Sequence, residues 1–365
     1  MSGQTVLVTG GSGYIGSWCV IGLLQQGYTV RTTVRNLARE AAVRAAIGTV
    51  VDAQDRLSFH AADLTSDAGW DAAVRGCDYL LHVASPISIS PPKNPDELIV
   101  PARDGTRRAV GAALRAGVKR VVLTSSVAAA SPRGSARESA SDEATWTDLD
   151  DPAVNAYARS KTVAERAAWD LIEAASRGTT GTMTLATVNP SVVLGPVLSR
   201  DFSDSVQVVQ RLLSGRMPGL PRLGFSFVDV RDVADLHIRA MTAPEAAGQR
   251  FIAAGDFAWM EEVAALLKAH LGEGARKVPT RRVPDLVLRL VALFDRSVAG
   301  VVPRLGERRT FISAKAQKML GWRPRPLKET VLDCARGAVA NVVGIRRGAI
   351  SGKMSVSAQA ARSIG

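Results

Sequence analysis

Three glycines close to the start of the chain constrain its fold more than any other feature. They lie at positions 10, 13 and 16 of the run TVLVTGGSGYIG. The apolar residues 6–8 before them predict a buried parallel strand, and the apolar stretch 15–24 behind them predicts a helix. A strand, a glycine turn and a helix N-terminus in this order are typical of a site for the pyrophosphate of a dinucleotide. We therefore predict a dinucleotide-binding turn at Gly10, Gly13 and Gly16.

The end of the second predicted strand indicates which dinucleotide binds. This strand covers residues 28–34 and is followed by Arg35 and Asn36. Proteins that bind NAD usually place Asp or Glu about 20 residues after the glycine turn, where the carboxylate binds the ribose 2′-hydroxyl. A carboxylate would repel the 2′-phosphate of NADP, whereas an arginine pairs with a phosphate. Arg35, with Arg39 one helical turn later, therefore predicts NADP (NADPH) as the cofactor.

Predicted strands and helices alternate through the first half of the chain. Further strands are predicted at 57–61, 79–83, 118–124 and 183–188, with helices at about 37–47, 68–75, 95–116 and 153–175 between them. This alternation is typical of an α/β protein with a Rossmann-type, doubly wound parallel sheet. After Pro190 the pattern becomes irregular and richer in Pro, Gly and Arg, with helices predicted at 204–213 and 260–271. That change predicts a smaller C-terminal substrate lobe.

The same pattern divides the chain. We expect an NADP-binding domain at residues 1–190, with further sheet segments from about 226–255. Residues 191–344 are expected to form most of the substrate-binding lobe. Residues 345–365 lack apolar periodicity and predict a disordered basic tail.

Charge and cysteine content favour a small-molecule site over other partners. The net charge of the 365-residue chain is +12, and the last 95 residues carry 19 basic and 6 acidic side chains. No nucleic-acid-binding motif accompanies this charge, and a solvated basic surface explains it. The three cysteines and four histidines have no metal-ligand spacing. We expect a cytoplasmic monomer or homodimer, without metal, that binds neither nucleic acid nor membrane.

Tyr157 and Lys161 predict the chemistry. A spacing of four residues places both side chains on one face of the predicted helix 153–175. A phenol can transfer a proton, and a neighbouring ammonium lowers the phenol's pKa from its ordinary value near 10. Ser126 follows the predicted strand 118–124, and the carboxyl end of a central strand opens into the ligand crevice of such sheets. We predict Ser126, Tyr157 and Lys161 as the catalytic group.

With these residues in place, the chain resembles an extended short-chain dehydrogenase/reductase. It is most similar to the dihydroflavonol 4-reductase, cinnamoyl-CoA reductase and bacterial aldehyde reductase group, from about residue 4 to 342. Further matching segments are 62–64, 82–86, 189–196, 227–234 and 321–324. The plant flavonoid reductases have Asn five residues after the catalytic serine, where this chain has Ser131. Reduction of a dihydroflavonol is therefore not favoured.

The resemblance implies a mechanism and further cofactor contacts. NADPH gives hydride to a carbonyl carbon, Tyr157 protonates the oxygen, Ser126 hydrogen-bonds that oxygen, and Lys161 tunes Tyr157 and holds the nicotinamide ribose. The substrate is then a small carbonyl compound, an aldehyde or a ketone. The cofactor contacts implied in addition to those above are Tyr14, Ile15, Asp63, Leu64, Val83, Ala84, Ser85, Thr124, Pro190 and Val193.

Two alternatives remain open from the sequence. A nucleotide-sugar epimerase or dehydratase, or a 3β-hydroxysteroid dehydrogenase-like enzyme, has the same fold. A non-catalytic NADP-binding redox sensor would belong to a different class. The basic residues Arg276, Lys277, Arg281 and Arg282 would favour anionic substrates such as acyl-CoA thioesters if they lined the lobe, and neutral aldehydes if they formed only a surface.

Overall fold

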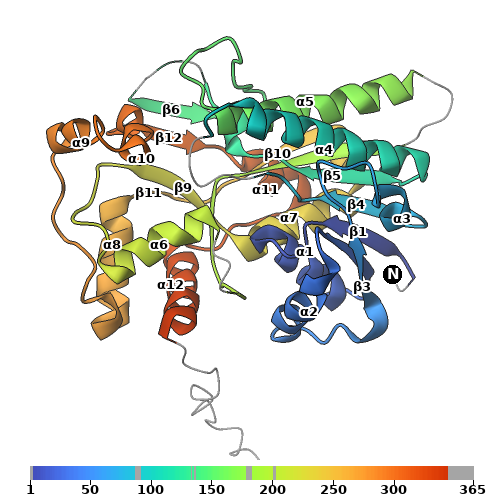
Figure 1. Ribbon diagram of the computed structural model, residues 1–365, viewed down its shortest axis with the longest axis horizontal. Helices are drawn as coiled ribbons and strands as arrows, with labels where there is room; N and C mark the ends of the chain where they lie inside the picture. Colours follow the sequence, from blue (N-terminus) through green and yellow to red (C-terminus); the bar gives the residue numbers. More distant parts are fainter. Residues whose placement is uncertain are drawn as a thin grey trace, which may run out of the picture.

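A seven-stranded parallel sheet forms the centre of the molecule (Figure 1). The computed structural model describes residues 3–86, 92–132, 134, 137–177, 183–199 and 203–343. The strand order is β10-β7-β5-β4-β1-β2-β3. The predicted doubly wound α/β sheet is confirmed. Its strands are β1 (Thr5–Thr9), β2 (Thr29–Val34), β3 (Leu57–Ala61), β4 (Tyr79–His82), β5 (Arg120–Thr124), β7 (Thr184–Pro190) and β10 (Gln249–Ala253).

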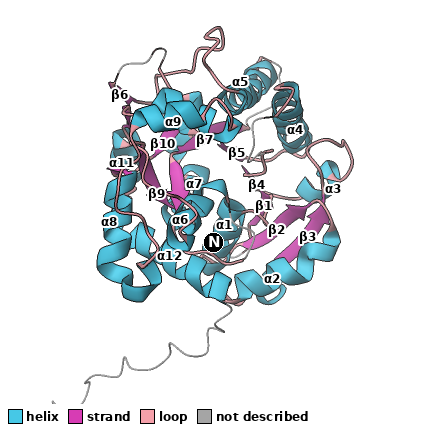
Figure 2. Cartoon of the chain, turned by 60° about the vertical axis from the view of Figure 1, so that its left-hand side comes forward, coloured by secondary structure: helices cyan, strands magenta, loops and turns pink. Residues whose placement is uncertain are grey.

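Helices cover both faces of this sheet, which is why its central strands β1, β4 and β5 are apolar on both sides (Figures 1 and 2). One face is covered by α1 (Tyr14–Gln25), α2 (Glu40–Gly48), α7 (Val230–Thr242) and α11 (Ala314–Leu320). The other face is covered by α3 (Trp70–Val74), α4 (Asp96–Arg115) and α5 (Ala156–Ser176). Val6, Leu7 and Val8 of β1 are at most 1% exposed, because one helical layer or the other packs on each of them.

The strand order reverses between β1 and β4. The chain runs outward from β1 through β2 to β3, then returns to β4 and runs through β5 and β7 to β10 on the other side. The two connections leave β1 and β4 in opposite directions, which opens a crevice at the carboxyl ends of these strands. The glycine turn follows β1 directly, so this topology places it at the crevice.

A smaller set of elements forms the lobe beside the sheet. Strand β9 pairs with β8 in parallel and with β11 antiparallel, and β12 pairs with β6 in parallel. These strands are β6 (Glu138–Ser141), β8 (Val192–Leu194), β9 (Gly224–Asp229), β11 (Phe257–Trp259) and β12 (Arg308–Phe311). The helices are α6 (Asp204–Ser214), α8 (Met260–Leu271), α9 (Asp285–Val291), α10 (Arg296–Ala299) and α12 (Leu327–Val343). The 226–255 segment thus serves both parts: β10 extends the main sheet, whereas β9 belongs to the lobe.

Most predicted boundaries lie within a few residues of the observed ones. The helix predicted from residue 153 begins at Ala156, because the side chain of Asn155 caps it by accepting a hydrogen bond from the Ala158 amide (2.9 Å). The helix predicted at 37–47 is divided into a 3₁₀ turn, Leu37–Arg39, and α2. The predicted disordered tail at 345–365 lies outside the described residues.

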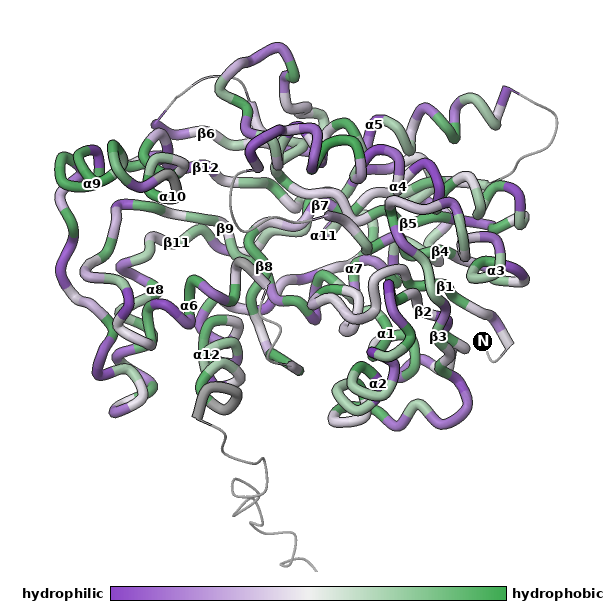
Figure 3. The backbone as a smooth tube through the Cα atoms, viewed as in Figure 1, coloured by the Kyte–Doolittle hydropathy of each residue, from purple (hydrophilic) through white to green (hydrophobic). Residues whose placement is uncertain are grey.

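Apolar side chains are exposed at the end of the lobe. Leu286 and Leu290 of α9 are 69% and 55% exposed, and Phe294 in the following turn is 92% exposed. Figure 3 shows this hydrophobic segment at the end of the molecule away from β1 to β3. None of the described helices has the combination of length and apolar character needed to cross a bilayer.

Candidate active site

The glycine turn is built for close backbone packing. Gly10 has a φ of +71°, which favours glycine, and the Gly13 amide donates to the Gly10 carbonyl (2.8 Å). A Cβ on Gly16 would lie 2.3 Å from the Gly10 oxygen, so α1 could not start at this place with a larger residue. Helix α1 has neither a side-chain cap nor an acidic residue in its first turn. Its N-terminal amides are therefore suited to an anion.

Arg35 and Asp63 lie at the ends of the two neighbouring strands. Both side chains line the same cavity as the glycine turn, together with Arg39. The Asp63 carboxylate accepts hydrogen bonds from the Thr65 hydroxyl (2.6 Å) and amide (2.8 Å). These bonds, together with the nearby Arg35 charge, lower the pKa of Asp63. An arginine and a fixed carboxylate thus lie together at the end of the sheet where the sequence predicts the adenosine half of the cofactor.

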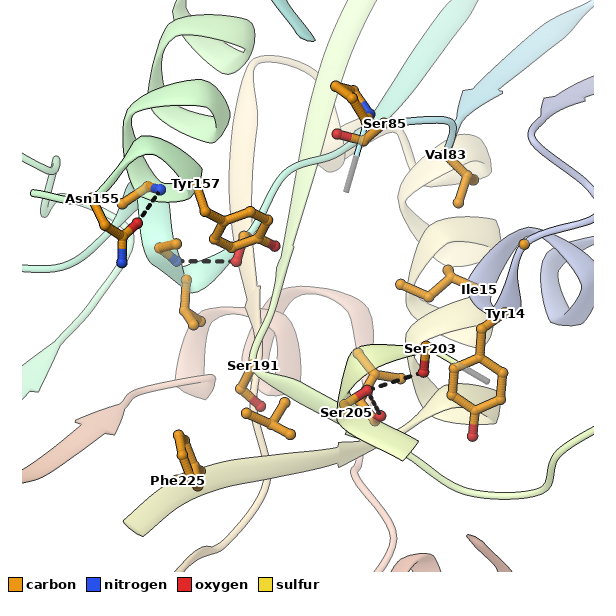
Figure 4. A pocket seen from close by; sticks show the side chains of 18 of the residues that line it. Tyr14, Ile15, Val83, Ser85, Asn155, Tyr157, Ser191, Ser203, Ser205 and Phe225 are labelled. Carbon is orange, nitrogen blue, oxygen red and sulfur yellow. Dashed lines mark hydrogen bonds between the residues drawn. The ribbon is translucent and has the colours of Figure 1, made fainter. Parts of the chain in front are cut away.

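One cavity of about 1810 Å³ connects the glycine turn with the lobe. Thr9 joins the two strands at the crevice, because its hydroxyl accepts hydrogen bonds from the Val83 and Ala84 amides (3.0 Å each). The predicted residues that line the cavity are Gly10, Gly13, Tyr14, Ile15, Gly16, Arg35, Asp63, Leu64, Val83, Ala84, Ser85, Ser126, Tyr157 and Val193. Figure 4 shows how Tyr157 of α5 and Asn155, which caps this helix, lie across from Tyr14 and Ile15.

Three predicted residues do not line this cavity. Thr124 turns its hydroxyl to the buried His237 of α7 (2.7 Å), and Pro190 is buried at the end of β7. Lys161 is 5% exposed and lies one helical turn beyond Tyr157 in α5. The structure thus places Lys161 behind Tyr157.

Ser126 and Tyr157 both line the cavity. Ser126 caps the 3₁₀ turn Val127–Ala129 and accepts a hydrogen bond from the Ala128 amide (3.1 Å), which fixes its hydroxyl oxygen. Tyr157 is 37% exposed, unusually open for a large aromatic side chain in this protein. Tyr157 is therefore the more accessible of the two residues in the cavity lining.

Burial changes the acidity of Lys161. Loss of solvent lowers the pKa of its ammonium to about 8, and the negative charge of Glu165 opposes this change. The Lys161 charge in turn adds to the effect of burial on His82, whose pKa falls to about 3. Lys161 is thus poised to lose or keep its proton near neutral pH.

Several polar residues of the site were not found from the sequence. Glu165 and Arg250 are buried, and Arg304 and Arg309 line the lobe end of the cavity. The buried Asn189 was part of the matching segment 189–196, but its side chain had no predicted role. The periodicity of α5 could have indicated Glu165, since it lies four residues after Lys161. Arg250 carries no such signal, because its contacts come from segments about 85 to 121 residues away in the sequence.

The cavity fits a nicotinamide dinucleotide. Its glycine cradle and uncapped helix are suited to a pyrophosphate, and the Arg35 guanidinium is suited to a 2′-phosphate. The Tyr14 and Ser191 hydroxyls, both buried in its wall, have no hydrogen-bond partner among the described residues. Among all the residues that the structure describes, no group of three or more His, Cys, Asp or Glu side chains could hold a metal ion.

Comparison with known proteins decides the family. A family model described as the NAD dependent epimerase/dehydratase family matches residues 6–254. The chain belongs to this family. Cinnamoyl-CoA reductase 1 of Arabidopsis thaliana is 38% identical to the chain over 256 residues, which are 69% of this chain and 71% of that protein. The resemblance to extended short-chain reductases is confirmed.

Solved structures agree with this membership. Yeast methylglyoxal/isovaleraldehyde reductase Gre2, solved as a complex with NADPH, matches with a TM-score of 0.76 and 26% identity over 93% of this chain and 99% of that one. UDP-glucose-4-epimerase from Stenotrophomonas maltophila matches with a TM-score of 0.71 and 23% identity over 93% and 99% of the two chains, and shares the fold.

Proposed function

We propose that this family member is an NADPH-dependent reductase of a neutral aldehyde or ketone, with Tyr157 as the proton donor. The chain is an NADP-dependent oxidoreductase that acts on carbonyl or CH–OH groups, as its reductase relatives indicate. The observation that supports the finer proposal is that Ser126 and the exposed Tyr157 line the same cavity, which begins at the glycine turn.

NADPH, when bound, supplies the hydride that adds to the carbonyl carbon. The turn from Gly10 to Gly16 would hold the pyrophosphate, and Arg35 would hold the 2′-phosphate. Lys161 would hold the nicotinamide ribose from beneath Tyr157. The positions of the glycine turn and Arg35 along one cavity wall support these roles, and Lys161 lies one helical turn beyond Tyr157 in α5.

The chain's own hydroxyls would complete the reduction. As negative charge develops on the carbonyl oxygen, the Tyr157 hydroxyl gives it a proton. Ser126 would donate a hydrogen bond to the same oxygen, because its own oxygen already accepts from the Ala128 amide. The Lys161 ammonium favours the tyrosinate left by this transfer, since opposite charges attract.

The positions of the basic residues of the lobe favour a neutral substrate, because most of them lie outside the cavity or are paired with a carboxylate. Arg276, Lys277, Arg281 and Arg282 do not line the cavity, and Arg282 pairs with Glu261 at the surface. Arg309, which does line the cavity, pairs with the buried Glu307 (2.9 Å). Arg304 is the remaining basic side chain at that end and lies over the Phe225 ring (5.2 Å). Most of this charge is therefore unavailable to a polyanionic acyl-CoA.

No comparable feature of the described residues supports the epimerase, dehydratase or redox-sensor alternatives. An NAD-retaining epimerase would not gain from Arg35 in the cavity, and a dehydratase usually has acidic residues beside the serine, where this chain has Ala128 and Ala129. A redox sensor without turnover would not need Tyr157 exposed to the cavity.

Tyr157→Phe tests the proposal. The variant should bind NADPH as the original protein does and lose about 10²–10⁴-fold in kcat, because only the proton donor is removed. Tyr79→Phe, at the start of β4 and outside the cavity, is the matched control. The measurement is NADPH consumption with a panel of neutral aldehydes, ketones and acyl-CoA thioesters. Near-normal turnover by Tyr157→Phe, or turnover of acyl-CoA alone, would contradict the proposal.

A further inference from the structure

A buried acidic residue lies beneath the proposed catalytic group. Glu165 of α5 is 0% exposed. Its carboxylate accepts hydrogen bonds from the Ser125 hydroxyl (2.6 Å), the Asn189 amide group (2.9 Å) and the Arg250 guanidinium (2.7 Å). Thr187 of β7 adds a fourth bond (3.1 Å). These donors replace the water that the carboxylate loses on burial.

Arg250 makes this arrangement rigid. Its side chain is 9% exposed and donates to the Glu143 and Thr145 carbonyls (2.7 and 2.9 Å) as well as to Glu165. Its guanidinium also stacks on the Trp146 ring, 3.7 Å from the ring centre. The ion pair therefore ties α5 to β10 and to the segment that precedes α5. Removing two charges from water is costly, so a buried ion pair often adds little to the stability of the fold. Stabilisation alone therefore does not explain this pair.

The buried cluster touches the backbone that presents Ser126. Ser125, which donates to Glu165, is the neighbour of Ser126 in the chain. Asn189 donates one hydrogen bond to Glu165 and another to the Ser126 carbonyl (3.2 Å). Lys161 lies one helical turn before Glu165, and no ion pair within 4.0 Å joins them among the described residues. Glu165 thus acts on Ser126 through bonds and on Lys161 through its charge.

We propose that Glu165, clamped by Arg250, is a positioning residue that fixes the Ser126 loop and serves as the buried counter-charge of Lys161. The proposal rests on the proposed function, because it assigns Glu165 a role in the same reaction. If Glu165 only held neighbouring segments in place, its hydrogen bonds would be sufficient for its role. If it is also the counter-charge of Lys161, its negative charge is required.

Other charged groups around Lys161 do not replace Glu165. Tyr157 lies on the same helix, and His82 of β4 is buried and uncharged with its pKa near 3. Helix α4, the main neighbour of α5, pairs Arg103 with its own Asp104 and Arg108 with Asp67. Arg250, on β10, is neutralised by Glu165 itself. Glu165 is the described carboxylate that raises the pKa of Lys161 against the effect of burial.

Glu165→Gln separates charge from shape. Glutamine keeps an oxygen that can accept the Ser125 and Asn189 bonds, but the negative charge is lost. The pKa of Lys161 should then fall below about 8, and activity that requires the ammonium should be lost at lower pH. We expect the alkaline limb of the kcat profile to move by about one pH unit toward acid, the lower end of the effect of one nearby opposite charge.

Two further variants keep the test decisive. Glu173→Gln, two turns later in α5 and exposed, is the matched control and should leave the profile unchanged. Glu165→Gln with Arg250→Gln removes both charges of the buried pair and should recover stability if the single variant folds poorly. Its profile should keep the acid shift, because Glu165 and not Arg250 acts on Lys161.

A readout that needs no turnover completes the design. The pKa of Lys161 can be followed by ¹⁵Nζ NMR of the protein without substrate, with Lys161→Arg to assign the signal. A lower Lys161 pKa in Glu165→Gln supports the inference even if no carbonyl compound proves to be a substrate, which would contradict only the proposed function. Equal Lys161 pKa values in the two proteins, or a pH-independent loss of kcat together with a lower Tm, would overturn it.

Discussion

At the scale of single residues, the site divides its charges between the surface of the cavity and the interior behind it. Arg35 is exposed at the cavity wall, where its charge can meet a ligand. Glu165 and Lys161 are buried, and their charges act on one another through the protein. In the proposed function, the positive charge of Arg35 at the wall selects the ligand, whereas that of Lys161 in the interior controls proton transfer.

Arg35→Ala tests ligand selection. NADPH should lose about tenfold or more in affinity, near 1.4 kcal/mol, while NADH binding changes little, because only NADPH carries the 2′-phosphate. Dissociation constants for both cofactors, from fluorescence titration, measure the ratio. Arg107→Ala on α4, outside the cavity, is the control. An unchanged preference for NADPH in Arg35→Ala would show that another group recognises the phosphate.

At the scale of elements, the start of α1 depends on a residue without a side chain. Gly16 packs on the backbone of the glycine turn. A Cβ on Gly22, two turns later in the same helix, would instead meet only the tip of the Ile238 side chain, at 2.9 Å. Backbone cannot move aside as a flexible side-chain tip can. The two glycines therefore offer a matched pair within one helix.

Gly16→Ala should displace the first turn of α1 and weaken NADPH binding by about tenfold or more, because the amides that face the phosphates move. Gly22→Ala should keep the affinity, and its Tm should change little or rise, since alanine favours the helix interior. Calorimetric titration with NADPH and thermal unfolding of both variants provide the comparison. Equal NADPH affinities in the two variants would mean that the turn tolerates a Cβ at Gly16.

Elements were easier to predict from the sequence than the contacts between them. Strands β1, β4 and β5 contain short apolar runs, and the glycine turn, Tyr157 and Lys161 lie within local patterns of a few residues. The Glu165–Arg250 pair instead joins positions 85 residues apart, and no local pattern distinguishes Arg250 from the other arginines. The buried Asp232, which accepts a hydrogen bond from the Arg325 amide (2.6 Å), is likewise set by the packing of α7 against the C-terminal segment. Such partners are decided by topology.

At the scale of the whole molecule, two buried histidines couple stability to pH. His82 and His237 are 0% exposed, and burial lowers their pKa values to about 3 and about 4. In the unfolded chain both titrate near 6.5. Between these values the unfolded state binds more protons than the folded state, so the free energy of unfolding decreases as pH falls from 6.5.

The loss should be large on the scale of a typical domain. At pH 5 each histidine contributes about 2 kcal/mol of destabilisation, and the pair about 4 kcal/mol, against a total stability of about 5–15 kcal/mol. Most carboxylates with shifted pKa values, such as Asp63, Asp78 and Asp104, have lowered pKa values, so they affect stability at more acidic pH than this window.

Urea unfolding at pH 7.5, 6.5, 5.5 and 4.5 should therefore show a continuous decrease in the free energy of unfolding that begins near pH 6.5. His237→Asn should reduce the slope by about half whatever its effect on stability at pH 7.5, whereas the exposed His270→Gln should not. A free energy of unfolding that stays constant down to pH 4.5 would mean that the two histidines are protonated in the folded protein, and that the packing around β4 and α7 admits water.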